Sequence, residues 1–317
     1  MVRWSQEQAR SPKAARRGGL GPQARGIFDR LFGGGEPKPP ALPRTEALTL
    51  AVTSGKGGTG KSFLATNLAV LLHQAGRKIT VVDCDFGLAC NHLLMGVSPK
   101  LTLQHLVSGK ATVREVRVST PAGPGLVPGA SGVRRMADLA DQELLAFGAG
   151  MAELATMNDV LIFDVGAGIS PQNVLTMLCA DQLVLVIEPE IAALTDAYAV
   201  IKCVTQLRDS VRFAVVVNRV TRAGQGERTF DKLAEVADRY VGIKLDYLGE
   251  VGADPAVTQR RLGQLPLAVT DPSGKTTGAL RSILANLEQV TGAFAPRRVP
   301  GGQGLEARFQ EHRLFLC

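Results

Sequence analysis

The sequence predicts a single α/β domain whose mostly parallel sheet is doubly wound and covered by helices on both faces. Three observations predict it: apolar, β-branched runs alternate with amphipathic stretches, the runs stay apolar at successive positions, and a glycine-rich turn directly follows the first run. Strands buried on both faces need such continuous apolar runs, because helices cover each side of a parallel sheet. The alternation spans residues 47–292, where we expect the domain.

The expected elements follow one another from residue 48 to residue 291. The strands are short apolar runs that end in a polar residue or a glycine, and they cover residues 48–54, 78–83, 159–164, 182–188, 211–218 and 247–252. The helices are longer stretches with apolar residues on one side, and they cover residues 61–75, 137–157, 191–208, 226–240 and 276–291. We find no internal repeat, so the alternation belongs to one domain.

Two basic tails flank the expected domain. Residues 1–46 are rich in Gly, Pro and Arg and carry nine basic and four acidic side chains, whereas residues 291–317 carry four basic and two acidic ones. Residues 47–290 carry 23 of each sign, so the net charge of +7 comes from the tails. Affinity for random DNA scales with the phosphates that a folded basic surface neutralises, so this neutral core predicts no specific nucleic-acid partner. We therefore divide the chain into an N-terminal tail and linker (1–46), the domain (47–292) and a C-terminal tail (293–317).

Both tails contain apolar residues at helical spacing, which makes them candidates for a weak contact with a membrane surface or a partner protein. These residues are Ile27, Phe28, Leu31 and Phe32 near the start, and Leu305, Phe309 and Leu316 near the end. A tail that packs on its own domain or stays disordered is the equal alternative.

The composition predicts a cytoplasmic protein with reduced thiols. No apolar run is long enough to span a membrane and the start lacks the apolar core of a secretory signal, so any membrane contact would be peripheral, on the inner face of the cell membrane. The five cysteines are scattered and include no C-x-x-C pair, which argues against a zinc site, an iron–sulfur cluster or a disulfide frame.

A phosphate-binding loop is the clearest functional motif. Residues 55–62 satisfy G-x-x-x-x-G-K-[ST], and the loop with the residue after it consists of Gly55, Lys56, Gly57, Gly58, Thr59, Gly60, Lys61, Ser62 and Phe63. The glycines let successive backbone N–H groups point at an anion, Lys61 reaches the β and γ phosphates, and the Ser62 hydroxyl binds Mg²⁺. A chance glycine-rich turn is the alternative in a chain with 35 glycines, but the strand before and the helix after the loop favour nucleotide binding.

Carboxylates end two of the expected strands. Asp83 and Asp85 lie two positions apart after the second strand, so both side chains leave the backbone on the same side, and Asp164 ends the apolar run VLIFD. We predict that Asp164 holds a water bound to Mg²⁺, since magnesium keeps several waters and takes few direct protein ligands. An aspartate at a strand end is also a common helix cap, and without the phosphate loop that interpretation would come first.

The loop and the carboxylates resemble those of the MinD and ParA ATPases, P-loop NTPases of the SIMIBI class with a deviant Walker A motif. The resemblance rests on the early lysine of K-G-G-T-G-K-S (Lys56) and on D-C-D-F-G-L (83–88), and it covers residues 47–291. It implies a Mg²⁺-dependent enzyme that hydrolyses ATP to ADP and phosphate slowly and faster with a partner. It also implies a homodimer on ATP binding, in which Lys56 contacts the phosphates held by the other subunit. A solvated lysine on an exposed loop is the alternative for Lys56.

The same resemblance implies further roles for single residues. Asp85 would orient the attacking water and act in catalysis with Lys56 and Lys61, while Asp83 would support the magnesium shell or the loop. Asn218 would hydrogen-bond the adenine, and the loop that contains Asp254 would close over the base. An asparagine at a strand end is otherwise ordinary turn chemistry.

Within that group the chain looks most like the FlhG/FleN branch, the MinD-like regulators of flagellar number and placement. The stretches that carry this likeness cover residues 86–96, 101–116, 125–139, 164–170 and 194–202. The chain departs at Cys90, His92 and Ile191, where the branch usually has Asn, Asp and Pro, and these positions lie near the expected dimer or partner face.

The branch implies a set of partners. Besides a second copy of the chain, these are the signal-recognition-particle-type GTPase FlhF, flagellar basal-body components or a flagellar transcription activator. A MinD-type division-site ATPase, a ParA-type segregation ATPase and a nucleotide-bound scaffold without turnover stay open as alternatives.

Overall fold

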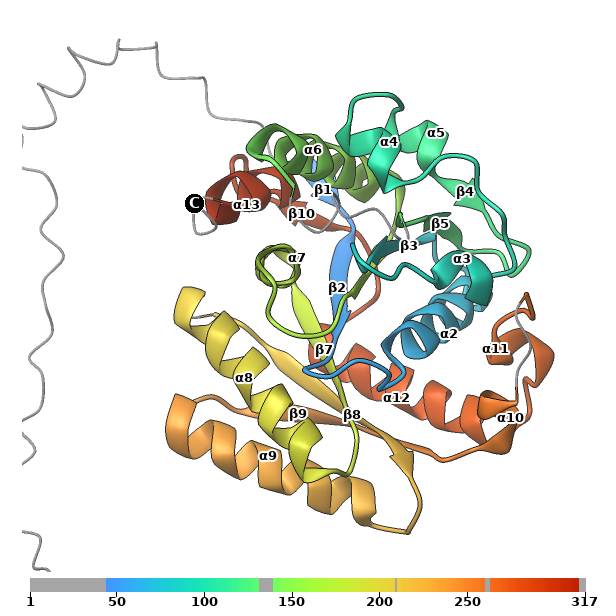
Figure 1. The fold of residues 1–317 in the computed structure, drawn as a ribbon, viewed down its shortest axis with the longest axis vertical. Helices are drawn as coiled ribbons and strands as arrows, with labels where there is room; N and C mark the ends of the chain where they lie inside the picture. Colours follow the sequence, from blue (N-terminus) through green and yellow to red (C-terminus); the bar gives the residue numbers. More distant parts are fainter. Residues whose placement is uncertain (1–43, 131–138, 209, 260–262, 314–317) are drawn as a thin grey trace, which may run out of the picture. The chain divides into compact units, whose positions relative to one another are not determined.

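An eight-stranded sheet forms the middle layer of the computed structural model, which describes residues 44–130, 139–208, 210–259 and 263–313 (Figure 1). The strand order is β4-β5-β3-β6-β2-β7-β8-β9, and every neighbouring pair is parallel except β4 and β5. The strands are β2 (Leu48–Thr53), β3 (Ile79–Cys84), β4 (Val118–Ser119), β5 (Gly125–Val127), β6 (Val160–Val165), β7 (Gln182–Ile187), β8 (Phe213–Val220) and β9 (Leu245–Gly252). The expected doubly wound, mostly parallel sheet is confirmed.

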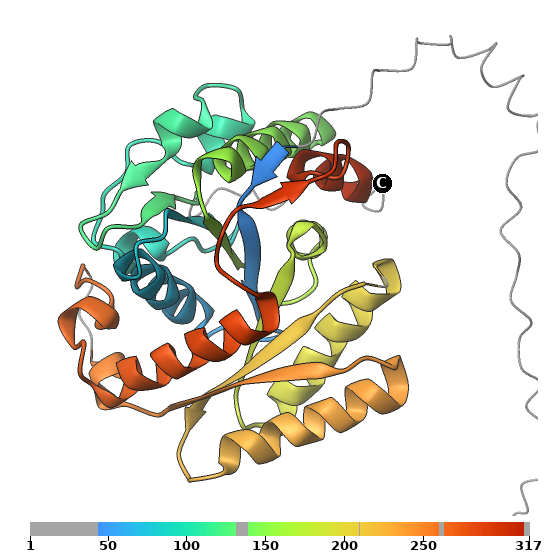
Figure 2. The same ribbon diagram turned by 180° about the vertical axis from the view of Figure 1, so that it is seen from behind.

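Helices cover both faces of this sheet (Figures 1 and 2). The side chains of β2 alternate between two apolar clusters: Leu50 packs with the residues of α2 and α12, and Ala51 packs with those of α6, α7, α8 and α9. The long helices are α2 (Lys61–Gln74), α6 (Asp141–Met157), α7 (Pro171–Cys179), α8 (Ile191–Leu207), α9 (Gln225–Val241) and α12 (Lys275–Thr291). Burial on both faces is the reason why the central strands read as continuous apolar runs.

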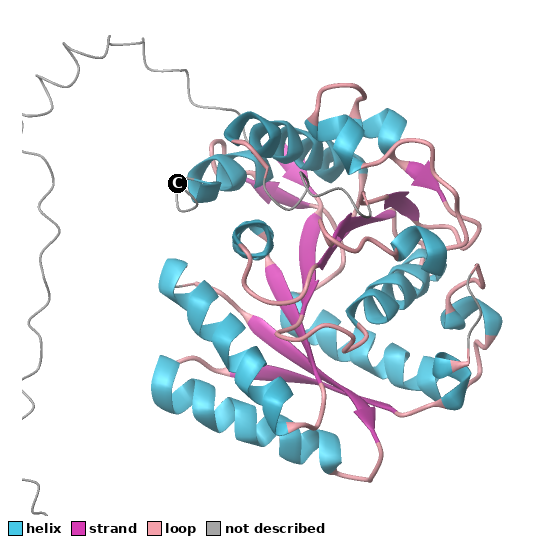
Figure 3. Ribbon diagram, viewed as in Figure 1, coloured by secondary structure: helices cyan, strands magenta, loops and turns pink. Residues whose placement is uncertain are grey.

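Short helices lie in the connections between these elements (Figure 3). They are α3 (Asn91–Leu94), α4 (Leu103–Val107), α5 (Val113–Val116), α10 (Pro255–Thr258) and α11 (Leu267–Thr270). α3 follows the loop after β3 and α10 follows β9, so both lie at the carboxyl edge of the parallel strands.

The sequence located the six long strands to within two residues, but it missed α7 and the short strands β4 and β5. Residues 172–179 of α7 are all buried, so this helix has no amphipathic repeat for a pattern to detect. β4 and β5 span two and three residues, which is shorter than any periodic signal. The helix expected from residue 137 begins at Asp141, and residues 131–138 lie outside the described residues.

Part of the segment expected as a C-terminal tail packs on the domain, which was one of the two alternatives for it. β1 (Arg44–Glu46) pairs in antiparallel fashion with β10 (Arg297–Val299), and α13 (Leu305–His312) lies against α6 and α7. The Phe309 ring meets the Phe147 ring edge-on at a centroid distance of 5.2 Å, and the Leu305 N–H donates to Glu46 Oε2 at 2.8 Å. The apolar residues Leu305 and Phe309, which we considered for a membrane or partner contact, are therefore buried in this structure.

Several expectations fall on parts of the chain that are not described. The apolar residues between Ile27 and Phe32, residues 1–43 of the N-terminal tail, Leu316 and Cys317 lie outside the described residues. Within the described ranges, no helix combines the length and the apolar character that crossing a bilayer requires.

Candidate functional site

The phosphate loop joins β2 to α2 at the carboxyl edge of the sheet. Gly58 and Gly60 have φ angles of 81° and 93°, in the left-handed region that glycine adopts without a side-chain clash. Gly60 directly precedes α2, and no side chain caps that helix, so its first N–H groups stay available for an anion. A Cβ on Gly55 would lie 2.2 Å from the carbonyl carbon of Asp196, so the loop also packs closely against α8.

Lys61 and Ser62 open α2 beside a buried carboxylate. Lys61 is 8% exposed, and its positive charge helps to lower the pKa of Asp164, as does the Ser62 hydroxyl. Burial has the larger effect and raises the pKa of Asp164. Asp164 Oδ1 is buried and accepts no hydrogen bond in the structure. A buried acceptor that is left without a donor suits a ligand or an ordered water.

Asp83 and Asp164 lie opposite each other on neighbouring strands. They are register partners of β3 and β6 and are at most 1% exposed. Burial raises the pKa of Asp83 most, and the neighbouring Asp164 carboxylate raises it further. Two carboxylates this close in a buried place favour either a shared proton or a nearby cation.

Asn91 links the two carboxylates and was missed by the sequence analysis. Its backbone N–H donates to Asp83 Oδ2 at 2.9 Å, and its Nδ2 donates to Asp164 Oδ2 at 2.8 Å. The side chain is fully buried, and its Oδ1 has no partner. The only local signal was its place between Cys90 and His92, two of the three departures from the family pattern, and no rule of spacing marks such a bridge.

Asp85 holds the loop that follows β3. Its Oδ1 accepts from the N–H groups of Gly87 at 3.1 Å and Leu88 at 2.9 Å, while its own N–H donates to Asp83 Oδ1 at 3.3 Å. The side chain is half-buried, and both of the hydrogen bonds that it accepts go to Oδ1. This arrangement fixes the carboxylate in one orientation at the end of β3.

The three departures from the family pattern lie in different surroundings. Cys90 lies against the Ser62 hydroxyl, and burial raises the pKa of its thiol to about 11, so the thiol stays protonated at neutral pH. Ile191 is 86% exposed at the start of α8. His92 is half-buried in α3, and nothing in the structure gives it a role.

A pocket of about 230 Å³ opens between the phosphate loop and β9. Its walls are mostly apolar and come from Gly60, Phe63, Asn218, Arg219, residues 251–254, Val257 and Thr258. Asn218 Nδ2 donates to the Thr59 carbonyl at 2.7 Å, and its Oδ1 accepts from the Arg219 N–H at 2.9 Å. Both ends of this amide therefore bind protein groups and hold the loop against β8.

Asp254 shapes the wall of the same pocket. Its Oδ1 accepts from the Ala256 N–H at 2.8 Å, and its Oδ2 accepts from the Thr276 hydroxyl at 2.5 Å. These hydrogen bonds lower the pKa of Asp254. Because both oxygens are used within the protein, Asp254 positions α10 at the pocket rim.

Lys56 points to an acidic cluster at the start of α8. Its Nζ lies 3.0 Å from Glu190 Oε2, and Glu190, Glu188 and Asp196 together raise the pKa of Lys56. The lysine side chain is 42% exposed. Glu190 was not singled out from the sequence, because only the fold brings it to the loop.

The residues present fit a magnesium ion bound with a nucleotide. Among the described residues, no group of three or more His, Cys, Asp or Glu side chains could hold a metal ion by itself. Magnesium takes few protein ligands when phosphate and water oxygens complete its octahedral shell. The Ser62 hydroxyl and the unpartnered Asp164 Oδ1 are the oxygens available here.

Comparisons with known proteins agree with this geometry. Residues 50–267 match the family model described as the CobQ/CobB/MinD/ParA nucleotide binding domain. The antiactivator FleN of Pseudomonas aeruginosa is 32% identical over 239 residues, which are 75% of this chain and 85% of that protein. The flagellum site-determining protein YlxH of Helicobacter pylori is 32% identical over 203 residues, which are 64% of this chain and 68% of that protein.

A solved structure shares the fold. The cell division ATPase MinD of Pyrococcus furiosus superposes with a TM-score of 0.65 at 25% identity, covering 77% of this chain and 99% of the other. The MinD/ParA resemblance and the likeness to the FlhG/FleN branch are thereby confirmed.

Proposed function

Because this chain belongs to the CobQ/CobB/MinD/ParA nucleotide-binding domain family, we propose that it is a Mg²⁺-dependent ATPase whose nucleotide state switches its association with a partner. The observation that carries the proposal is the meeting of the phosphate loop with two buried carboxylates, one of which has an oxygen without a donor. A cradle of N–H groups next to buried acid oxygens suits a phosphate chain with its divalent cation.

The chain's own residues divide the work of the proposed reaction. The N–H groups after Gly60 and the Lys61 ammonium bind the phosphates, and the Ser62 hydroxyl ligates Mg²⁺, which neutralises the phosphate charge when it is bound. Asp83 and Asp164 would accept hydrogen bonds from water bound to the metal. The Asp85 carboxylate accepts a hydrogen bond from the attacking water, and the hydrogen bonds from residues 87 and 88 hold it in place.

The pocket beside Asn218 is the proposed base site. Its mostly apolar walls suit a flat heterocycle, and Asn218 keeps the phosphate loop at the right distance through Thr59. Each end of the amide makes one hydrogen bond to a protein group, so its second N–H and its second lone pair are left for an adenine contact. Asp254 contributes by holding α10 against the pocket.

We further propose that two chains meet at the carboxyl edge when ATP is bound. Three apolar side chains at this edge are exposed: Leu88 after β3, Ile169 after β6 and Ile191 after β7, at 75%, 51% and 86%. The first two follow the neighbouring strands β3 and β6, and β2 lies between β6 and β7. Exposed apolar residues beside a charged site are typical of an interface. Lys56 is close to this group, because it pairs with Glu190, the residue directly before Ile191.

The biological process that we propose is the control of flagellar number or placement. The antiactivator FleN and the flagellum site-determining protein YlxH are each 32% identical to this chain. The partner would then be a flagellar GTPase of the FlhF type, a basal-body component or a flagellar transcription activator, met in the cytoplasm or at the inner face of the membrane.

A phosphate-release assay with ATP and Mg²⁺ tests the enzyme. We expect turnover by the wild-type chain and none by Asp85→Asn, which keeps an oxygen for the N–H groups of the loop but loses the basic carboxylate. Binding of ATP without turnover, alone or with lipid, would leave a nucleotide-dependent scaffold instead. No binding of ATP to folded protein would overturn the proposal.

Sedimentation tests the dimer, and a deletion tests the process. The Asp85→Asn protein with ATP should sediment as a dimer, and adding Lys56→Ala should return it to a monomer. Flagella counted per cell after deletion of the gene should change in number or position. An unchanged count with intact ATP turnover would move the assignment to another branch of the family.

A further inference from the structure

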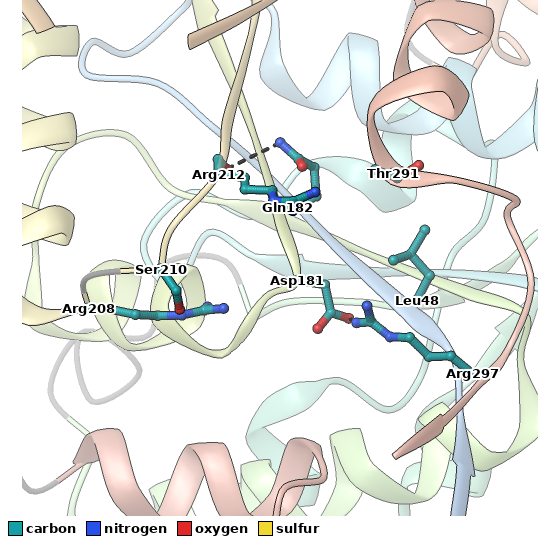
Figure 4. Close-up of a pocket in the computed structure, with 8 residues that line it drawn as sticks. All are labelled: Leu48, Asp181, Gln182, Arg208, Ser210, Arg212, Thr291 and Arg297. Atoms are coloured by element: carbon teal, nitrogen blue, oxygen red, sulfur yellow. Dashed lines mark hydrogen bonds and ion pairs between the residues drawn. The ribbon is translucent and has the colours of Figure 1, made fainter. Parts of the chain in front are cut away.

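A second pocket, of about 300 Å³, lies at the amino edge of the sheet, opposite the phosphate loop (Figure 4). Leu48 and Gln182 in its lining are the first residues of β2 and β7, and Arg212 directly precedes β8. These strands are parallel, so they begin at this edge and end at the nucleotide edge. The pocket is therefore separate from the proposed nucleotide site by the length of the sheet.

Three arginines from distant parts of the chain line this pocket. Arg208 ends α8, Arg212 lies before β8, and Arg297 begins β10. Figure 4 shows the Arg297 guanidinium against the Asp181 carboxylate and the Arg208 side chain extending toward the same open space. Three arginines in the lining of one hollow make it a positively charged place.

Asp181 is the one carboxylate among the described lining residues, and its oxygens are already occupied. Its Oδ2 accepts from the Thr49 N–H at 2.8 Å and from the Thr49 hydroxyl at 2.5 Å, and it also pairs with Arg297. Its Oδ1 pairs with Arg308 Nη1 at 2.7 Å. One carboxylate therefore serves two arginines, and it leaves Arg208 and Arg212 without an acidic partner among the described residues. Asp209 lies outside the described residues.

The arginine cluster is short of acceptors. Arg208 Nη1 donates to the carbonyls of Leu178 at 2.8 Å and Ala180 at 2.7 Å, so one nitrogen of its guanidinium has protein acceptors. Arg308 Nε is buried and has no partner. The charge of Arg308 adds to burial in lowering the pKa of both Arg208 and Arg297, as mutually repelling cations do. An anion in the pocket would supply acceptors and relieve this repulsion.

We propose that this pocket is a second ligand site, which binds a small phosphate-bearing anion at Arg208, Arg212 and Arg297. A phosphate group carries up to two charges and three free oxygens, so it can accept from guanidinium groups that approach from different directions. A simple carboxylate offers one charge and two oxygens in a plane. The volume of about 300 Å³ is at the lower end for small-molecule sites, which suits a compact anion.

Calorimetric titration with pyrophosphate tests the site. The full chain carries Lys61→Ala in this experiment, and Mg²⁺ is omitted, so that the phosphate loop is disabled and does not compete. We expect binding of one pyrophosphate per chain. Arg212→Gln and Arg297→Gln should each weaken it about fivefold, because each removes a charge-assisted hydrogen bond, and the double variant should weaken it at least about twentyfold.

Arg298→Gln is the matched control. It removes the same charge one residue away from Arg297, and neighbours in a strand point to opposite sides. Its affinity for pyrophosphate should equal that of the parent protein. If Arg297→Gln unfolds the chain, as circular dichroism would show, Arg212→Gln decides alone, because this side chain is exposed. Absence of binding, an equal loss in Arg298→Gln, or acetate that binds as tightly as pyrophosphate would each overturn the proposal.

Discussion

The two edges of the central sheet differ in charge, in the segments that supply their residues, and in which buried hydrogen-bonding groups lack a partner. At the carboxyl edge, buried acceptors of Asn91 and Asp164 lack donors, whereas at the amino edge a buried donor, Arg308 Nε, lacks an acceptor. The first edge is built from motifs that are contiguous in the sequence. The second edge is built from single residues of five segments that only the fold brings together. One sheet therefore carries an acid-lined place for a cation and its phosphates and an arginine-lined place for an anion.

The two edges also contribute differently to nucleotide chemistry and to the stability of the fold. The loops at the carboxyl edge carry the phosphate-loop glycines Gly58 and Gly60, which have positive φ, and the exposed Gly87 and Leu88. The amino edge is closed by β1, β10 and α13, which bring the C-terminal segment onto α6 and α7. Substitutions at the two edges should consequently affect different measurements.

The largest effect that we predict is a loss of stability near the amino edge. Phe309→Ala should lower the free energy of unfolding by about 3 to 5 kcal/mol, because a buried aromatic ring leaves a cavity against Phe147 and Gly148. Urea unfolding of the nucleotide-free protein measures this. Gln310→Ala, an exposed neighbour, should stay within about 0.5 kcal/mol of the wild type. A cost below about 1 kcal/mol would mean that α13 contributes little to the fold.

Lys61→Ala should abolish nucleotide binding at the opposite edge. The affinity for Mg²⁺-ADP should fall at least about 100-fold, equivalent to about 3 kcal/mol of lost contacts with the phosphates. Calorimetry measures the affinity, with Arg212→Gln at the amino edge as the control. A comparable loss in the control would show that the two edges are not independent.

Asn91→Ala should affect both the stability and the function of the carboxyl edge. Removing the donor that serves Asp164 should cost about 1.5 to 3 kcal/mol of unfolding free energy, the usual range for a hydrogen bond to a charged group. The measurement is again urea unfolding without nucleotide. His92→Ala in the same short helix should change this free energy by less than about 0.5 kcal/mol. Equal effects of the two substitutions would remove Asn91 from the site.

Glu190→Gln should have the smallest effect and the opposite sign. It releases Lys56 from its own chain, so the ATP-bound dimer should tighten by about two- to fivefold, as expected for the loss of one exposed ion pair. Sedimentation of the Asp85→Asn protein with ATP measures the dimer. The control is Glu235→Gln, which breaks the exposed pair with Arg239 on α9. A weaker dimer would indicate that Glu190 itself belongs to the interface.

The fold class and the phosphate loop were determined by the sequence alone. Apolar runs, helical repeats and the G-x-x-x-x-G-K-[ST] spacing are local features, and the chemistry that they imply depends on residues within a few positions of each other. The six long strands were therefore predictable, and the loop was found between the strand and the helix that were expected around it.

Tertiary structure alone decided how the rest of the molecule is arranged. Asn91 reaches Asp164 across 73 positions, Lys56 reaches Glu190 across 134, and Leu305 reaches Glu46 across 259. The docking of α13 and the arginine pocket arise in the same way, from strand pairing and helix packing between segments that carry no shared local signal. A pattern of neighbours in the sequence cannot encode such contacts, because the free energy that selects them comes from burying the whole set at once.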